Sequence, residues 1–335
     1  MPPPEMSRHG SGDSPGPLFV IGGAEDKLRR RTVLTRFVES AGGTDARIAV
    51  IPTASSLGPE VVEVYDAVFR KLGAREVFGA RPEAREQAND PALAELLGDA
   101  TGIFMTGGNQ LKLSAVIAGT AFGDAILAAH RRGATVGGTS AGASIQSSHM
   151  VAFGSGGTTP KQRMTQVAAG LGLLPGCVID QHFEQRNRYG RLLMIVSQSP
   201  QLLGIGVDED TGAVIRHDTG RPVLEVVGRG AVTILDGARM VSNAHEAKRN
   251  LPILASGVQL HVLPAGARFD MTTRTLIPDE ARVIEDEVDE LGPVAELAAA
   301  GRDLRKLARD IAAGDVSPTV LRRRRARRTR GAAHE

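Results

Sequence analysis

The sequence predicts an α/β fold in which helices cover both faces of a mostly parallel sheet and the C-terminal part is rich in strands. From Leu18 to about Ser148, continuous apolar runs typical of buried parallel strands alternate with amphipathic helical patterns. Beyond residue 200, short strand patterns follow one another directly. With 335 residues, of which 41% are hydrophobic, the chain can bury a sizeable core.

The elements follow in order along the chain. The expected strands of the first half are LFVIGG, RIAVIPTAS, EVFGA, TGIFMTGG and ATVGGT. Helices are expected from Asp26 to Ser40, near Glu60 to Leu72, and directly after TGIFMTGG. GSGGTTPKQR predicts a flexible loop that could cover a site. The strand GCVIDQHF and a helix from Arg186 to Ser199 come next, before the strands LLGIGVDEDTGAVIRH, VLEVVG, VTILDG and VQLHVLPAG.

Composition divides the chain into three parts. Residues 1–17 are rich in Pro, Gly and Ser and lack the apolar region of a secretory signal, so a disordered leader on a cytoplasmic protein is expected. Residues 18–284 are expected to form one folded domain. Residues 285–335 predict a helical extension over 293–313 and a disordered tail with seven arginines from Arg322 to Arg330. No apolar run approaches the length of a membrane helix.

Composition also excludes several classes of function. The formal charge of +2 argues neither for nor against a polyanionic partner. The absence of Trp with only two Tyr leaves few stacking platforms for single-stranded nucleic acid, so nucleic-acid binding is not expected. The single cysteine, Cys177, excludes internal disulfides and is interpreted as a small buried strand residue. The spacing of His217, His245 and His261 along the chain does not resemble that of metal ligands. Neither a metal nor an organic cofactor is expected.

A candidate nucleophile lies in the segment ATVGGTSAGASIQ. Residues 138–142 read GTSAG and fit G-x-S-x-G, the motif that places a serine on a strained turn between a strand and a helix. The flanking glycines let neighbouring backbone pass close to Ser140. The same pattern also fits an ordinary Gly- and Ser-rich loop between two elements, so catalysis requires a base and an oxyanion site elsewhere.

His182 and Glu209 are candidates for the base and for the acid that orients it, because a serine hydroxyl needs both at neutral pH. His182 ends the apolar run of VIDQHF, and Glu209 ends that of GIGVDED. All three residues are therefore predicted at strand ends. Taken singly, His182 also fits a structural histidine, and Glu209 a solvated acid beside Asp208 and Asp210.

The oxyanion site is expected beside the same turn. The N–H of Ala141 follows the nucleophile, and the turn containing Gly108 and Asn109 can supply a second donor, although that turn also fits a tight connection from strand to helix. The first turn, VIGGAEDK, lacks both G-x-G-x-x-G and the lysine-hydroxyl pair of a phosphate-binding loop.

Six segments in this order resemble the cyanophycinase family of serine peptidases, which also includes aspartyl dipeptidase: IGGAEDK, FMTGGNQ, GGTSAGAS, DQHFEQRNRYGRLL, GIGVDEDTGAVI and LHVLPAGARFD. The resemblance runs from about Leu18 to Leu276. It implies a flavodoxin-like sandwich similar to class I glutamine amidotransferases and a Ser140–His182–Glu209 triad. A homodimer is expected as well. The chain order serine, histidine, acid differs from that of α/β-hydrolases.

The resemblance also implies a substrate. Members of the family release β-aspartyl-arginine dipeptides from cyanophycin, a poly-aspartate with arginine on each side-chain carboxylate. Its carboxylates need cationic partners and its guanidinium groups need acids or amide oxygens. The candidate substrate-binding residues are Gln110, Asp180, Gln181, Arg186, Arg188 and Arg191. Two alternatives remain, an aspartyl dipeptidase and a catalytically silent protein that binds acidic peptides.

Overall fold

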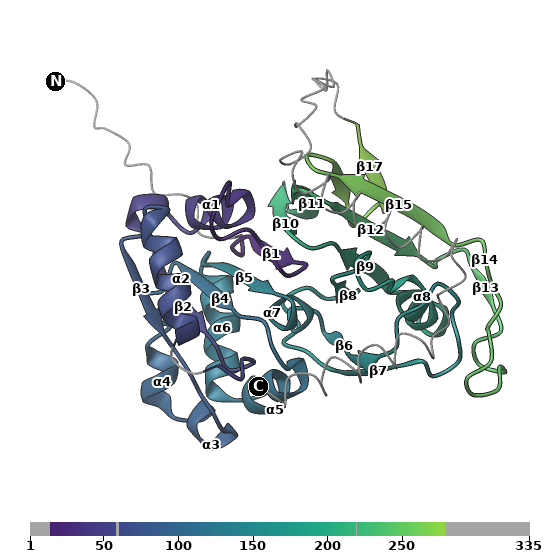
Figure 1. Ribbon diagram of the computed structural model, residues 1–335, viewed down its shortest axis with the longest axis horizontal. Helices are drawn as coiled ribbons and strands as arrows, with labels where there is room; N and C mark the ends of the chain where they lie inside the picture. The colour runs from purple at the N-terminus through teal and green to yellow at the C-terminus, as the bar shows by residue number, and fades with distance from the viewer. Residues whose placement is uncertain (1–13, 58–59, 219, 279–335) are drawn as a thin grey trace, which may run out of the picture. The chain divides into compact units, whose positions relative to one another are not determined.

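The structure is a computed structural model that describes residues 14–57, 60–218 and 220–278 (Figure 1). Residues 1–13 and the predicted extension and tail at 285–335 lie outside the described residues, so the predictions made for them stay predictions.

The larger sheet of the described part contains parallel and antiparallel strands. Its strands are β1 (Leu18–Ile21), β2 (Arg47–Ile51), β3 (Glu76–Gly79), β4 (Gly102–Met105), β5 (Thr135–Thr139), β10 (Thr211–Asp218), β11 (Arg221–Gly228), β16 (Arg268–Asp270) and β17 (Thr275–Ile277). These nine strands lie in the order β17-β16-β11-β10-β1-β5-β4-β2-β3. The half from β1 to β3 is parallel, and every pairing from β1 to β17 is antiparallel.

Helices cover both faces of the parallel half, as predicted. They are α1 (Thr32–Ser40), η1 (Gly43–Asp45), α2 (Glu60–Lys71), α3 (Arg85–Ala88), α4 (Pro91–Glu95), α5 (Gln110–Ile117), α6 (Ala121–Arg131), α7 (Ala141–Ser144) and α8 (Tyr189–Gln198). On one face, Phe37 of α1 and Phe69 of α2 pack against Phe104 of β4 in an aromatic cluster. On the other face, apolar residues of α5 and α6 bury the alternate side chains of the same strands.

A second sheet carries part of the predicted site. It contains β8 (Cys177–Gln181), β9 (Leu203–Val207), β12 (Ala231–Asp236) and β15 (Gln259–Pro264) in the order β15-β12-β9-β8. The other strands of the described residues form two two-stranded sheets. One pairs β6 (His149–Gly154) with β7 (Thr165–Ala169), and the other pairs β13 (Val241–Ser242) with β14 (Ala255–Ser256).

The prediction of a mostly parallel sheet is therefore correct for the first half of the chain and wrong for the second. β10 and β11 are joined by a short hairpin, which brings consecutive strands together antiparallel. β8 and β9 are parallel, but they belong to the second sheet and do not extend the first. The predicted strand-rich C-terminal part is present.

Two helices begin later than predicted. The first starts at Thr32 and not at Asp26, because the Asp26 carboxylate accepts hydrogen bonds from the backbone N–H groups of Leu28, Arg29 and Arg31 and folds this stretch into a turn. α8 starts at Tyr189 and not at Arg186, because Asn187 has a left-handed φ of 49°.

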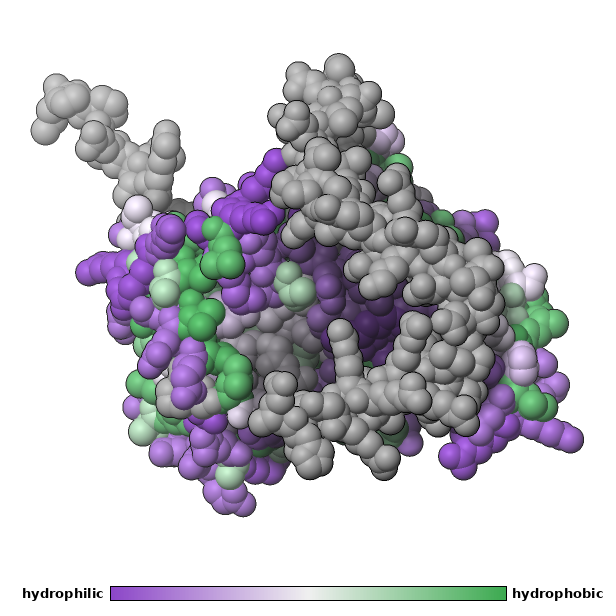
Figure 2. All heavy atoms as spheres, viewed as in Figure 1, coloured by the Kyte–Doolittle hydropathy of each residue, from purple (hydrophilic) through white to green (hydrophobic). Residues whose placement is uncertain are grey.

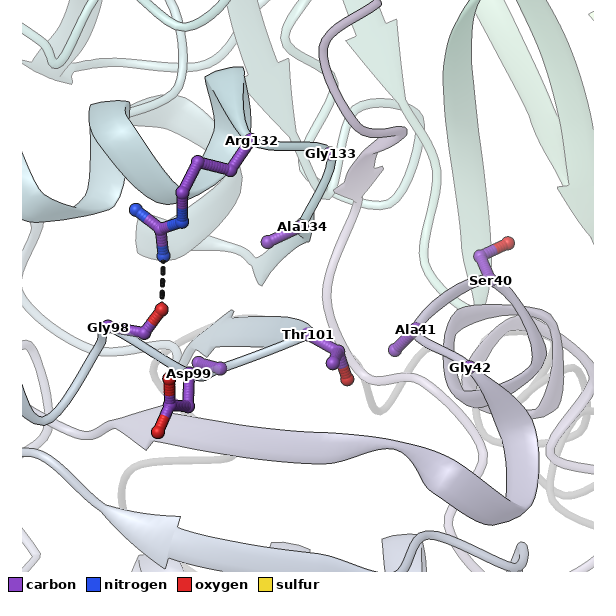
Figure 3. A pocket seen from close by; sticks show the side chains of 10 residues that line it. Ser40, Ala41, Gly42, Gly98, Asp99, Thr101, Arg132, Gly133 and Ala134 are labelled. Carbon is purple, nitrogen blue, oxygen red and sulfur yellow. Dashed lines mark hydrogen bonds between the residues drawn. The ribbon is translucent and has the colours of Figure 1, made fainter. Parts of the chain in front are cut away.

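A hollow of about 360 Å³ lies at the amino ends of β4 and β5, where Thr101 and Ala134 line it (Figure 3). There Arg132 donates to the Gly98 carbonyl oxygen at 2.7 Å. Because Ser140 follows the carboxyl end of β5, this hollow is separate from the predicted site. On the face shown in Figure 2, hydrophilic residues predominate and hydrophobic residues form separate small groups.

Within the described ranges, no single helix is long and apolar enough to cross a membrane. Only α5 and α6 taken together reach the required length and composition, and their axes differ in direction by 93°.

Candidate active site

Ser140 lies at the carboxyl end of β5, directly before α7, as the motif predicts. Its φ of 52° and ψ of −106° lie outside the regions that non-glycine residues usually occupy. Such a conformation persists only where the surrounding structure enforces it. The turn leaves the side chain of Ser140 partly exposed, whereas Thr139 and Ala141 on either side are buried.

The two glycines of the motif are required by close backbone contacts. A Cβ atom on Gly138 would lie 2.1 Å from the carbonyl oxygen of Gly142. A Cβ on Gly142 would lie 2.1 Å from the carbonyl oxygen of Met105. The expectation that neighbouring backbone passes close to this turn is therefore correct.

His182 directly follows β8 of the second sheet and contacts Ser140, which follows β5 of the larger sheet. Its Nε2 lies 3.0 Å from the Ser140 Oγ, and its Nδ1 lies 2.5 Å from Oε1 of Glu209. The residue is 7% exposed. Its φ of 47° turns the chain sharply after the strand, which brings the ring to the serine. The structure thus brings together the three residues that the sequence singles out.

Glu209 is distinguished from the two aspartates beside it by its contacts. The carboxylate of Asp208 accepts the backbone N–H groups of Glu184 at 3.1 Å and Ala231 at 3.0 Å. The carboxylate of Asp210 accepts the N–H of Asp26 at 2.8 Å. Of the three acids, Glu209 is the one that contacts the imidazole of His182.

The surroundings of His182 favour a neutral imidazole. Burial lowers its pKa from the ordinary value of 6.5, and the charges of Arg186 and Arg188 act in the same direction, while the hydrogen bond to Glu209 opposes them. A neutral ring that donates Nδ1–H to Glu209 leaves Nε2 free to accept the serine proton. In the part of the chain that the structure describes, no group of three or more His, Cys, Asp or Glu residues could hold a metal ion.

The predicted oxyanion donors differ in their contacts. The N–H of Asn109 donates to the Ala54 carbonyl at 2.8 Å, and its side-chain oxygen caps the first turn of α5. The N–H groups of Gly108 and Ala141 have no such partner among the described residues. Gly107 is close by, since a Cβ on it would lie 3.4 Å from the Ser140 Cβ. Of the three predicted donors, Gly108 and Ala141 are therefore the two whose N–H groups are not bonded within the described part of the chain.

Five of the six candidate substrate-binding residues form one hydrogen-bonded network. Gln110 accepts a bond from Gln181, which in turn accepts one from Arg188, and Arg188 also donates to Asp180. Arg191 donates to both oxygens of Asp180, whose side chain is fully buried. Burial lowers the pKa of Arg188 to about 10. Their direct contact with substrate stays a prediction.

Arg186 differs from these five. It is exposed, and among the described residues its side chain has no ion pair. Its backbone N–H donates to the His182 carbonyl at 3.1 Å, and its charge is one of the causes that lower the pKa of His182.

Sequence reasoning missed the first turn of the chain, the segment VIGGAEDK, as part of this site. A Cβ on Gly23 would lie 2.3 Å from Cε1 of His182, so the glycine lies directly against the imidazole. The nearby Glu25 is buried and accepts a hydrogen bond from Thr139, the residue before the nucleophile. The signal was the segment IGGAEDK, which is part of the family resemblance but from which no residue was assigned to the site.

Comparison with known proteins places this geometry in a family. The model of peptidase family S51 matches residues 18–223, a stretch that contains the serine, the histidine and the acid. The chain belongs to peptidase family S51.

Curated relatives agree with this assignment. The chain is 41% identical over 258 residues to a cyanophycinase of Geminocystis herdmanii. The aligned stretch covers 76% of this chain and 94% of that relative. It is 39% identical over 268 residues to a cyanophycinase of Trichormus variabilis. Here the aligned stretch covers 79% of this chain and 89% of the relative. A crystal structure of a peptidase from an acI-B1 actinobacterium shares the fold, with a TM-score of 0.54 and 23% identity over 77% of this chain and 98% of its own.

Proposed function

We propose that this S51 peptidase is a cyanophycinase-type serine exopeptidase. It hydrolyses the aspartate backbone of multi-L-arginyl-poly-L-aspartate and releases β-aspartyl-arginine dipeptides. The observation that carries the proposal is the continuous chain of contacts from the Ser140 Oγ through His182 to Glu209, at 3.0 and 2.5 Å. The two cyanophycinases at about 40% identity support the substrate class.

Each member of the triad has one role. Ser140 Oγ attacks the carbonyl carbon of the scissile peptide bond while His182 Nε2 takes its proton. His182 then gives this proton to the leaving amine, and the acyl–serine ester remains. Water, deprotonated by the same imidazole, cleaves the ester and regenerates Ser140. Glu209 holds the ring in the tautomer that leaves Nε2 free and stabilises the charged ring that forms transiently.

Backbone donors stabilise the negative charge that develops on the carbonyl oxygen. The N–H groups of Gly108 and Ala141 are available for this role, and each such donor is worth roughly 3 kcal/mol of barrier. The N–H of Asn109 is bonded to Ala54, so we assign Asn109 a supporting role as the cap of α5.

Substrate recognition is assigned to the exposed cation near the base. Arg186 has no ion pair among the described residues, so its guanidinium is available to a substrate carboxylate. The buried network of Asp180, Arg188 and Arg191 supports the turn that carries Arg186 and His182. Gln110 directly follows the turn of Gly108 and Asn109 and accepts a bond from Gln181, and we assign this pair to the orientation of the substrate.

The remaining expectations are part of the same proposal. Residues 18–284 form the catalytic domain, the fold is a sandwich of the class I glutamine amidotransferase type, and the enzyme acts in the cytoplasm as a homodimer without a cofactor. Parallel strands with a nucleophile turn at the carboxyl end of β5 support the assignment of the fold.

Two measurements on purified protein test the proposal. Cyanophycin and a panel of aspartyl dipeptides, assayed side by side, separate the polymer-cleaving enzyme from an aspartyl dipeptidase. Ser140→Ala should retain the fold and lose nearly all turnover, since loss of a triad nucleophile costs several orders of magnitude. Residual activity within about tenfold of the wild type would exclude the serine mechanism. Failure of the wild type to cleave any of these substrates would favour the silent binding protein.

A further inference from the structure

One short segment, which begins at the last residue of β1, contacts all three turns of the triad. The carbonyl oxygen of Ile21 accepts the N–H of Ser140 at 3.0 Å, and that of Gly22 accepts the N–H of His182 at 2.8 Å. The carbonyl oxygen of Gly23 accepts the N–H of Asp210, next to Glu209, at 2.9 Å. Three consecutive carbonyls therefore hold the nucleophile turn, the base turn and the acid turn.

The three residues held in this way share an unusual backbone conformation. Ser140, His182 and Asp210 have φ values of 52°, 47° and 50°, in the left-handed region that non-glycine residues rarely adopt. Strained conformations of this kind persist only where neighbouring structure over-determines them. The segment Ile21–Glu25, which we name the clasp, supplies that constraint.

Glu25 extends the clasp to the nucleophile through a side chain. It is 4% exposed, and its Oε2 accepts the hydroxyl of Thr139 at 2.5 Å. Its Oε1 accepts the hydroxyl of Tyr65 and the ammonium of Lys27, each at 2.6 Å. Burial raises the pKa of this carboxyl, but Lys27 and the hydrogen bonds from Thr139 and Tyr65 outweigh it and lower the pKa below its ordinary value. The carboxyl group thus meets three hydrogen-bond donors inside the protein.

We propose that Glu25 is a positioning residue of the peptidase, which fixes the Ser140 turn through Thr139 while the clasp carbonyls fix the turns of His182 and Glu209. Glu25 contacts neither the serine hydroxyl nor the imidazole, so it acts only through Thr139. The proposal rests on the catalytic roles assigned above. Its consequence is that the reactivity of Ser140 depends on the Thr139 hydroxyl.

The strand that carries Thr139 offers a matched control. Thr135 lies at the other end of β5, is fully buried, and donates its hydroxyl to the Ser40 carbonyl at 2.8 Å. Thr139→Val and Thr135→Val both remove one buried hydroxyl from the same strand and keep the β-branched shape. A purely structural role predicts equal effects, whereas a positioning role predicts an effect on catalysis for Thr139 alone.

The experiment measures kcat, KM, the melting temperature, and the rate at which a small fluorophosphonate labels Ser140. For Thr139→Val we expect kcat and the labelling rate to fall together by about 10- to 100-fold with KM nearly unchanged, because small misplacements of reacting groups cost about 100-fold. Thr139→Ser, which keeps the hydroxyl, should restore both rates, and Thr135→Val should match the wild type in both.

Glu25→Gln provides a second variant should Thr139→Val fail to fold. An amide cannot accept bonds from all three donors, so the same loss of labelling is expected. The inference is overturned if either folded variant labels within twofold of the wild type, or if Thr135→Val loses as much activity as Thr139→Val. A wild-type protein that neither labels nor cleaves would instead overturn the proposed function.

Discussion

The backbone of Gly23 lies against the ring of His182, so that a Cβ atom on Gly23 would come within 2.3 Å of the imidazole Cε1 and 2.5 Å of Nε2. Nε2 is also the atom that lies 3.0 Å from the Ser140 Oγ. The position of the base relative to the nucleophile is therefore set partly by the absence of a side chain at residue 23.

Gly23→Ala should move the imidazole away from Ser140 and lower kcat by about 100-fold. The glycine φ of +107° also makes alanine strained there, so stability will fall as well. Gly73→Ala is the matched control, because Gly73 has a φ of +103° and nothing within 4 Å of its added Cβ. It should lose about 1–2 kcal/mol of stability and no activity. Equal activities of the two variants would contradict this prediction.

The orienting acid is predicted to be Glu209 and neither of its neighbours. Glu209→Gln should fold normally and lower kcat by about two to four orders of magnitude, because the amide favours the wrong tautomer of His182. Steady-state kinetics and thermal unfolding on the same samples measure this.

Asp208→Asn and Asp210→Asn are the controls for that variant. Asp208 is 5% exposed and accepts two backbone N–H groups, so its replacement should cost stability more than turnover. Asp210 bonds to Asp26 in the same way. If Glu209→Gln stays active while a folded Asp208→Asn or Asp210→Asn fails, the assignment of the acid is wrong.

Much of the site could be predicted because its residues follow local patterns. Ser140, His182 and Glu209 each end an apolar run, and the carboxyl ends of β5, β8 and β9 do bring them together. The parallel strands and the covering helices of the first half follow from the same periodicity.

The clasp could not be predicted, because it depends on long-range contacts that no local pattern encodes. Glu25 and Thr139 are separated by 114 positions, and the sequence around Asp26 fits a helix as well as it fits a turn. The turn prevails because the Asp26 carboxylate bonds the N–H groups that a helix would use. The antiparallel half of the large sheet was missed for a related reason, since strand patterns do not specify the direction of pairing.

The loss of peptidase activity at low pH should follow the protonation of the His182 imidazole. Its pKa is lowered, so the ring stays neutral and able to accept a proton to below pH 6.5, and activity falls only as the pH drops through the lowered value. Arg186→Gln removes one of the charges that lower this pKa, and the loss of activity should then move to higher pH. Because burial is the larger cause, the movement should be small.

The rate of Ser140 labelling by a neutral sulfonyl fluoride measures this pH dependence without a contribution from substrate binding. Arg186→Lys retains the charge and should leave the pH dependence unchanged. Identical profiles for the wild type and Arg186→Gln would show that the charge of Arg186 does not reach the imidazole.

Asp180→Asn should destabilise the protein by about 3–5 kcal/mol, because it leaves the buried cations Arg188 and Arg191 without their carboxylate. Asp99→Asn is the contrasting change, since Asp99 is exposed and pairs with Arg47 at 3.3 Å. This change should lower the free energy of unfolding, measured with urea, by less than about 1 kcal/mol. Undiminished stability of Asp180→Asn with a raised KM would mean that Asp180 binds substrate and does not support the turn.

Removal of the chain after Pro318 should leave catalysis unchanged. The seven arginines from Arg322 to Arg330 repel one another, and the only apolar residue among them is Ala326, which predicts a segment outside the catalytic domain. Every contact described above for the triad and the clasp lies between residues 21 and 231. We therefore expect wild-type kcat and KM on a soluble β-aspartyl-arginine oligomer.

The same truncation should weaken retention on a heparin column, because arginine contacts to a polyanion are salt-sensitive. A full-length variant with Arg322→Gln, Arg323→Gln, Arg324→Gln and Arg325→Gln controls for chain length and should elute between the wild type and the truncated protein. If the truncated protein instead loses most of its activity on the soluble oligomer, then the tail helps to build the site. The boundary of the catalytic domain would in that case have to move beyond residue 284.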